Sequence, residues 1–311
     1  MTDSTVPLII LGGSDRKPPQ LPAGSEGRHP LSGCKGVDIQ LDGRSLIEHI
    51  VDRLRACGAF EPIFVAGPAA AYGRTRVDAE VIDTDASFGD NIRRALETMI
   101  ERFPGSPVAF TTCDILPDVG ELDSVLDDYR QSPHADLWFP LVVADPDQKL
   151  GASAWKPKYR IVPEPGQEAV SVLPSHLTVI DPESLRLELL YRIFELSYRT
   201  RNRPIRYRRA YILRDVTWTL LKQDVLHVLA LRLPTLTLDI VVNSMRTGNR
   251  IRRGKATLRE LEDALRKVFV RRRHRQRHPD RRIRLPLTRA MTLARDIDTV
   301  EEAEALGATF A

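Results

Sequence analysis

Apolar residues in the first 145 positions of the chain occur as short runs separated by amphipathic stretches. Runs typical of buried strands lie at 7–11, 61–67, 77–83, 108–112 and 136–143. Apolar positions at helical spacing predict helices at 45–57, 91–102 and 119–130. An alternation of strands and helices is typical of a mostly parallel sheet with helices on its faces.

The pattern changes after residue 150, where helical periodicity dominates. A helix is expected from Asp181 to about Tyr198, further helical pattern at 210–245, and another helix at 258–270. The central part is rich in leucine and is flanked by arginines, with Trp218 among them. It fits a helix lying on a membrane surface, a cap packed over the sheet edge, or an oligomer contact.

The composition indicates a chain with a sizeable hydrophobic core. It has 311 residues, of which 42% are hydrophobic, and no apolar run approaches the length of a membrane span. No basic segment precedes an apolar one at residues 1–10, and the three cysteines are isolated. We therefore expect a cytoplasmic protein with reduced thiols, and a peripheral membrane contact remains open.

A basic run at 271–284 accounts for more than the whole net charge of +4. No aromatic residue interleaves with it to stack on bases, so binding of nucleic acid is disfavoured. His274 and His278 are four residues apart, but the surrounding arginines disfavour a metal site. The run is expected to be a solvated, mobile loop that is dispensable for turnover of a soluble acceptor.

The first apolar run ends in a turn suited to phosphate. Gly12 and Gly13 follow Leu11 directly, and Ser14, Arg16 and Lys35 come after them. Glycines let phosphate oxygens approach backbone N–H groups, while the two cations neutralise phosphate charge. The spacing matches neither a P-loop nor a dinucleotide fingerprint.

The segment from Cys34 to Arg55 resembles the start of the nucleotidyltransferases with the GT-A-like fold. These include sugar-phosphate pyrophosphorylases and the molybdenum-cofactor guanylyl- and cytidylyltransferases. Their signature is a strand, Gly-Gly, a basic residue, Pro-Lys, a short strand and a "Gly-Arg-Pro-Leu-Ile" helix start. Here Cys34 and Ser45 stand in place of the two prolines. The resemblance implies that Arg16 and Lys35 are catalytic, and that Leu11, Gly12, Gly13 and Ser14 bind nucleotide with them.

Three carboxylates extend this resemblance. The run at 108–112 leads to Asp114, where the family places a metal-holding aspartate. Asp296 and Asp298 are similar to the family's closing "Asp-x-Asp-Thr-Pro-Glu-Asp-Leu", and their alternation lets both face one cation. The resemblance implies that the three hold Mg²⁺ or Mn²⁺. Thr299, with Glu302 three residues later, also predicts a capping box that starts a helix.

Two loops, at 87–91 and 17–34, each have two interpretations. In the resembling enzymes the segment 87–91 lies near the base, which implies nucleotide contacts for Gly89 and Asn91, while a capping role for Asp90 competes. The Pro- and Gly-rich stretch 17–34 is either a loop that closes over the triphosphate or a surface excursion.

The segment expected to bind the acceptor differs in sequence from the family's. Pro174-Ser175-His176 stands where a larger subgroup has "Gly-Gly-Asn", so no acceptor residues carry over. Lys156, Lys158 and Arg160 alternate and would share one face of a strand, suited to an anionic acceptor. An edge strand guarded by charge is the alternative.

Together these features predict a single three-layer α/β/α domain with a mixed, mostly parallel sheet and a helical insert. Residues 1–150 would form the nucleotide-binding core, 151–285 the acceptor side and insert, and 286–311 the closing segment of the same domain. The expected reaction is Mg²⁺-dependent transfer of a nucleoside monophosphate from an NTP to a phosphate-bearing small molecule, with release of pyrophosphate. A glycosyltransferase using a nucleotide sugar and a non-catalytic binding protein are the alternatives.

Overall fold

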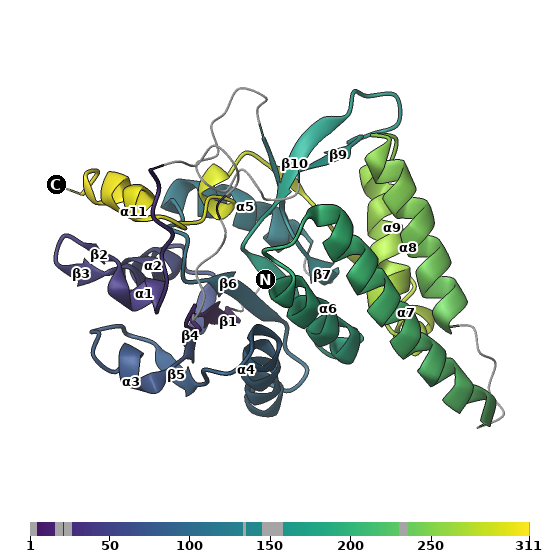
Figure 1. Ribbon diagram of the computed structural model, residues 1–311, viewed down its shortest axis with the longest axis horizontal. Helices are drawn as coiled ribbons and strands as arrows, with labels where there is room; N and C mark the ends of the chain where they lie inside the picture. The colour runs from purple at the N-terminus through teal and green to yellow at the C-terminus, as the bar shows by residue number, and fades with distance from the viewer. Residues whose placement is uncertain are drawn as a thin grey trace.

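The computed structural model describes residues 5–15, 21, 27–132, 135–144, 158–229 and 236–310. Its centre is a seven-stranded sheet with helices on both sides (Figure 1). In chain order the strands are β1 (Val6–Leu11), β4 (Phe60–Gly67), β5 (Glu80–Asp83), β6 (Val108–Thr112), β7 (Ala135–Trp138), β11 (Thr178–Ile180) and β12 (Arg282–Arg284).

The strand order is β12-β7-β11-β6-β1-β4-β5. All neighbouring strands are parallel except β11, which runs antiparallel to both β6 and β7. The carboxyl ends of β1, β5 and β6 therefore lie at one edge, and β11 begins at that same edge. The predicted mixed, mostly parallel sheet is confirmed.

Strand β1 is buried on both faces because helices cover each side of it. Leu8 and Ile10 pack with α2 (Leu46–Ala56) and α5 (Val119–Gln131), whereas Ile9 packs with α4 (Phe88–Arg102). Side chains alternate between the two faces of a strand, so a continuous apolar run suits this central position. The three-layer arrangement is the predicted one.

Small elements connect the first strands. The segment after Cys34 forms one helical turn, α1 (Lys35–Asp38), before the hairpin of β2 (Gln40–Leu41) and β3 (Arg44–Ser45). Asp42 and Gly43 both have positive φ in the hairpin turn. A capping box of Ser45 and Glu48 then starts α2. One further short helix, α3 (Ala69–Tyr72), follows β4.

The apolar run 136–143 is two strands, so the prediction of a single strand there is wrong. Pro140, which has no N–H to donate, lies between β7 and β8 (Leu141–Val143). Strand β8 belongs to a second sheet, of order β13-β8-β10-β9. Its other strands are β9 (Tyr159–Ile161), β10 (Val170–Pro174) and β13 (Leu287–Thr288).

The helical insert lies beside the sheet, and Figure 1 shows its α7–α8 pair as an antiparallel hairpin. Its helices are α6 (Leu187–Arg199), α7 (Ile205–Leu229), α8 (Leu236–Arg252) and α9 (Leu258–Phe269). The prediction of α9 is confirmed, but α6 does not begin at Asp181. Asp181 instead accepts the Glu183 N–H at 3.0 Å, forming a local turn before the helix.

The basic run is ordered, which corrects the prediction of a solvated loop. It contains α10 (Arg272–Arg277) and β12, in which Ile283 is fully buried. Two of its residues, His274 and Arg281, contact the buried carboxylate of Asp136. A 3₁₀ helix (Met291–Leu293) and α11 (Val300–Gly307) complete the described fold.

Candidate active site

The glycine turn after β1 is built around one buried phenol ring. The Tyr72 hydroxyl donates to the Gly12 carbonyl at 2.8 Å, and a Cβ on Gly12 would lie 2.2 Å from that hydroxyl oxygen. A Cβ on Gly67 would lie 2.5 Å from the same ring, and one on Gly36 would lie 3.1 Å from its oxygen. Gly12 is therefore required by packing, apart from any ligand.

Alanine at position 12 should destabilise the fold, whereas alanine at position 13 should be tolerated. At Gly13 the added Cβ would meet the Asn91 side-chain amide at 2.7 Å, which is the end of a side chain that can shift. We expect Gly12→Ala to lower the free energy of unfolding by about 1–3 kcal/mol. Urea unfolding of both variants measures this, and equal effects would contradict the packing argument.

The turn after β5 is joined to the glycine turn by hydrogen bonds. Asn91 is buried, and its Oδ1 accepts from the Thr84 hydroxyl at 2.7 Å and from the Ala86 N–H at 2.8 Å. The Ser14 hydroxyl donates to Asp85 Oδ1 at 2.5 Å. These contacts bring Ser14, Gly13 and Asn91 together at one edge of the sheet.

Gly89 lies where α6 crosses the start of α4. A Cβ there would be 2.8 Å from Glu195 Cβ, and the Gly89 N–H donates to Glu195 Oε2 at 3.1 Å. The close helix approach therefore requires glycine at this position. The N-cap of α4 is Ser87, not Asp90, since the Asp90 N–H donates to the Ser87 hydroxyl oxygen at 3.3 Å.

Lys35 is the centre of a buried charge cluster. Its side chain is only 5% exposed. The ammonium lies 2.6 Å from Asp298 Oδ1, 3.6 Å from Asp114 Oδ2 and 3.8 Å from Asp15 Oδ2. Burial lowers the pKa of Lys35, but the carboxylates of Asp114 and Asp298 outweigh it and hold the pKa above its usual value. The lysine is thus fully charged.

Three carboxylates converge beside this ammonium. Asp114, Asp296 and Asp298 each offer an oxygen, and these atoms lie within 4.8 Å of one another. The Ile297 N–H donates to the Asp114 carbonyl at 2.7 Å, which fixes the closing segment against the end of β6. The capping box of Thr299 and Glu302 forms as predicted at the start of α11.

The donor set suits a hard divalent cation. Carboxylate oxygens are the ligands that Mg²⁺ and Mn²⁺ prefer. Burial and the neighbouring Asp296 raise the pKa of Asp298 to about 6, because negative charges are crowded there. A divalent cation would offset the repulsion between these carboxylates, so the residues present fit the metal that the resemblance implies.

His176 belongs to the site and was missed by the sequence assignment. It precedes β11, and its Nδ1 lies 2.8 Å from the Thr112 hydroxyl and 4.0 Å from Asp114 Oδ1. The only sequence signal was its place in the segment that differs from "Gly-Gly-Asn". The antiparallel insertion of β11 beside β6 brings it to this edge.

The end of α6 also reaches the site, through residues that carry no motif. The Tyr198 hydroxyl donates to Asp15 Oδ1 at 2.5 Å, and Arg201 binds the same oxygen at 2.8 Å. Burial and the contact with Asp15 raise the pKa of Tyr198 to about 12, so its hydroxyl remains a donor. Tyr198 also stacks on Phe88. The insert is therefore tied to the residue that follows the glycine turn.

The remaining predicted residues lie elsewhere. Arg16 and Lys156 fall outside the described residues, as do positions 17–20 and 22–26 of the stretch 17–34. Lys158 and Arg160 are exposed at β9, an edge strand of the second sheet. Within the described part of the chain, no hydrogen bond or ion pair joins either of them to the Lys35 cluster.

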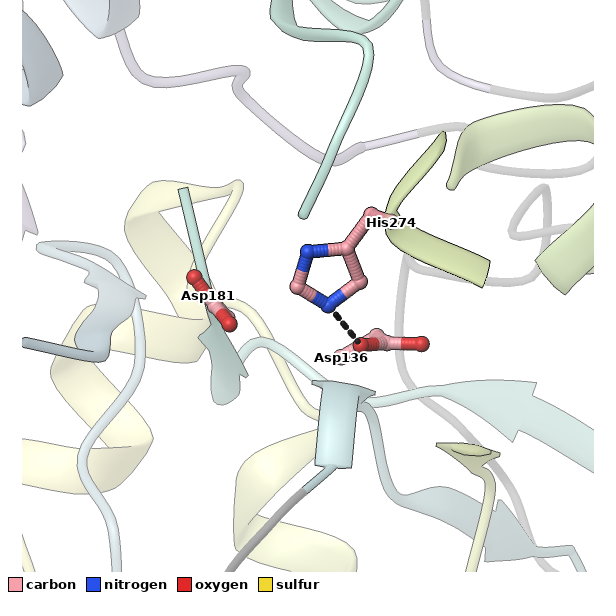
Figure 2. Close-up of side chains that lie close together, drawn as sticks. All are labelled: Asp136, Asp181 and His274. Atoms are coloured by element: carbon pink, nitrogen blue, oxygen red, sulfur yellow. Dashed lines mark hydrogen bonds and ion pairs between the residues drawn. The ribbon is translucent and has the colours of Figure 1, made fainter. Parts of the chain in front are cut away.

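A second group of possible metal ligands, Asp136, Asp181 and His274, is shown in Figure 2. Asp136 is fully buried, and its carboxylate lies 3.0 Å from Arg281 Nε and 3.2 Å from Arg266 Nε. Arg281 also pairs with Asp181. Two guanidinium groups already supply the positive charge, so this cluster does not fit a cation and is a structural ion network.

The mixed, mostly parallel sheet with the glycine turn at its carboxyl edge is an α/β fold that this chain shares with a solved structure. A hypothetical transferase from Thermus thermophilus matches with a TM-score of 0.56 and 18% identity, covering 96% of this chain and 100% of that one. No family model matches the chain, and no curated protein matches its sequence.

Two further solved structures have lower scores. CMP:2-keto-3-deoxy-manno-octonic acid synthetase complexed with CTP matches with a TM-score of 0.41 and 13% identity, over 61% of this chain and 78% of that one. The 2-C-methyl-D-erythritol 4-phosphate cytidylyltransferase from Thermus thermophilus has a TM-score of 0.35 and 16% identity, over 63% of this chain and 78% of that one.

Proposed function

We propose that this chain is a Mg²⁺-dependent nucleotidyltransferase that moves a nucleoside monophosphate from an NTP to a phosphate-bearing small molecule. One observation carries the proposal. A glycine turn, a buried lysine and three carboxylates, from segments far apart in sequence, converge at one sheet edge. Such a site combines backbone donors for phosphates with ligands for the metal that accompanies them.

The chemistry requires positioning and charge neutralisation more than covalent participation of the protein. An acceptor phosphate oxygen attacks the α-phosphorus, a new P–O bond forms, and the bond to the β-phosphate bridging oxygen breaks as pyrophosphate leaves. Backbone N–H groups from Leu11 to Ser14 would hold the β- and γ-phosphates, and Arg16 would stabilise the leaving pyrophosphate. Gly89 and Asn91 would lie on the nucleoside side.

Lys35 and the carboxylates would have complementary roles. Mg²⁺ held by Asp114 with Asp296 and Asp298 would supply positive charge to the phosphate oxygens. Lys35 would contact the α-phosphate as negative charge shifts in the transition state. Its ammonium lies 2.6 Å from Asp298 and 3.6 Å from Asp114. The lysine is thus next to the proposed metal ligands, where a phosphate held by the metal would meet it.

The acceptor would enter from the side formed by residues 151–285, with 1–150 holding the nucleotide and 286–311 closing the site. His176, which belongs to that side, lies next to Thr112 and Asp114. Lys156, Lys158 and Arg160 would attract an anionic acceptor.

A substitution at Lys158 tests the acceptor assignment. Lys158→Ala should raise the acceptor KM several-fold and leave NTP affinity unchanged, because the contact it removes would be made only on that side. Arg74→Ala, which removes an exposed cation of the nucleotide-binding half, is the matched control. An unchanged acceptor KM would assign Lys158 to the alternative role of guarding an edge strand.

A thermal-shift screen separates the proposed function from its alternatives. The protein is heated with Mg²⁺ and each NTP, or with UDP- and GDP-sugars, since a ligand that binds only the folded state raises the unfolding temperature. We expect an NTP to give the largest shift. A shift with a nucleotide sugar alone would favour a glycosyltransferase, although the segment after β6 reads Asp114-Ile115-Leu116 and lacks Asp-x-Asp. A shift with neither would favour a non-catalytic binding protein.

A further inference from the structure

The α7–α8 hairpin has an exposed apolar face in addition to the buried face through which its helices pack. On the inner side, Val216 and Leu220 of α7 are buried against Ile240 of α8 and Val268 of α9. On the outer side, Trp218 is 61% exposed and Leu229 is 76% exposed. A helix that is apolar on both sides is expected to be covered on both sides.

Several exposed apolar residues of α7 share one helical face. They are Tyr207, Trp218, Leu221, Val225 and Leu229, which together with the half-buried Tyr211 follow one another at steps of three, four or seven residues, and we call this set the hairpin face. Val242 and Met245, on the adjoining helix α8, are also more than half exposed. Exposed apolar residues therefore occur on both helices of the hairpin.

The polarity of the hairpin changes along its length. Val225 and Leu229 lie near the end where α7 leads to α8, and Trp218 comes next towards the base. Tyr211 and Tyr207 follow, and arginines gather at the base, at 206, 208 and 209 in α7 and at 250, 252 and 253 at the end of α8. The order from tip to base is thus aliphatic, aromatic and cationic.

The hairpin face is also cationic. Lys222 lies over the Trp218 ring at 5.7 Å, and Arg214 lies over the Tyr211 ring at 5.6 Å. Of the hairpin carboxylates whose side chains the structure describes, Asp215 binds Arg192 at 2.7 Å, and Asp224 is buried and accepts the Thr237 N–H at 2.8 Å. These carboxylates are therefore engaged in contacts that hold the insert together.

We infer that the hairpin face binds the surface of an anionic lipid bilayer, lying along it with its apolar side chains at the acyl boundary and its lysine and arginines at the headgroups. Tryptophan and tyrosine favour this interface because their rings are apolar and carry a polar group. Lysine and arginine add attraction to anionic headgroups. No described helix is long and apolar enough to cross a membrane.

A second copy of the chain fits this face less well. A two-fold interface sets the same surface against itself. Arg214 and Lys222 of one copy would then approach the same two cations of the other copy. Asp215 and Asp224 would not neutralise them, because Asp215 binds Arg192 and Asp224 accepts the Thr237 N–H. The charge therefore favours an anionic lipid surface over self-association. This inference goes beyond the proposed reaction and does not depend on it.

Vesicle flotation tests the inference. The whole protein is mixed with vesicles of phosphatidylcholine and phosphatidylglycerol, or of phosphatidylcholine alone. We expect binding to the mixed vesicles that weakens with salt. The double variant Val225→Asp/Leu229→Asp should reduce this binding at least about tenfold, and Arg214→Glu/Lys222→Glu by a similar factor.

Matched variants keep the test specific. Val225→Leu/Leu229→Met keeps the tip apolar, and Arg74→Glu/Arg289→Glu makes the same charge change at exposed sites away from the hairpin. Both should bind as the parent does, and unchanged circular dichroism and unfolding temperature check that each variant folds. Equal binding to both vesicle types would overturn the inference. So would absence of vesicle binding together with a dimer in sedimentation that Val225→Asp/Leu229→Asp dissociates.

Discussion

Asp114→Ala should slow pyrophosphate release by about 10²- to 10⁴-fold, the largest effect expected of a single substitution in this chain. Asp114 follows β6, lies within the group of three carboxylates and contacts the Lys35 ammonium at 3.6 Å. Its loss would remove one of the three proposed metal ligands and a carboxylate beside the lysine. The measurement is a phosphate assay coupled to pyrophosphatase, with the NTP and a phosphorylated acceptor identified by screening.

Asp118→Ala is the matched control for this prediction. Asp118 is a carboxylate four positions further along, where its side chain caps α5 by accepting the Glu121 N–H at 3.0 Å. Loss of a cap lowers stability by about 1 kcal/mol and leaves the site intact. The assignment of Asp114 is discarded if both variants release pyrophosphate at the rate of the parent.

Asp136→Ala should lower the free energy of unfolding by about 3–5 kcal/mol. The carboxylate is fully buried and is shared by Arg266, Arg281 and His274. Without it, two largely covered guanidinium groups lose their counter-charge. Urea unfolding at constant pH measures the change.

An exposed ion pair provides the comparison for Asp136. Asp127 pairs with Arg130 at 2.7 Å on the surface of α5, where such pairs contribute about 0–1 kcal/mol. Asp127→Ala should therefore have little effect on unfolding. A loss at Asp136 no larger than that at Asp127 would show that the buried network is energetically neutral.

The Asp136 network changes the expected effect of deleting residues 271–284. The sequence predicts a solvated, mobile loop here that is dispensable for turnover of a soluble acceptor. In the structure the deletion would remove β12 from the sheet together with Arg281 and His274. We therefore expect the shortened chain to fail to fold, so its inactivity would say nothing about the active site.

The sequence predicted the residues of the candidate site that stand directly beside a recognisable strand or helix. Gly12, Lys35 and Asp114 each follow or precede a recognisable strand or helix, and parallel strands bring such residues to one edge. His176 and Tyr198 were missed because their roles come from tertiary pairing. The antiparallel strand β11 places His176 beside Thr112, and packing of α6 on α4 brings Tyr198 to Asp15.

The basic run shows the same limit. From periodicity and composition alone, its residues are expected to be charged and exposed. The carboxylate that binds His274 and Arg281 is that of Asp136, about 140 positions earlier in the chain. Asp136 looks like any polar residue within an apolar strand, and nothing local marks it as the partner of Arg266 and Arg281. The boundary between β7 and β8, by contrast, is marked in the sequence by Pro140, which cannot donate a ladder hydrogen bond.

The packing of Tyr72 makes the ring and Gly12 evolutionarily interdependent. Gly12, Gly36 and Gly67 come from three separate segments, and each lacks a side chain where the same ring or its hydroxyl approaches. Substitutions in one contact group are not additive, so a smaller residue at position 72 would relax the constraint on Gly12. At Gly67 a Cβ would still lie 2.5 Å from the Gly12 carbonyl oxygen, so glycine stays required there whatever residue occupies position 72. Gly12 and Tyr72 therefore form an epistatic pair, in which selection judges a change at the glycine against the size of a side chain 60 positions away.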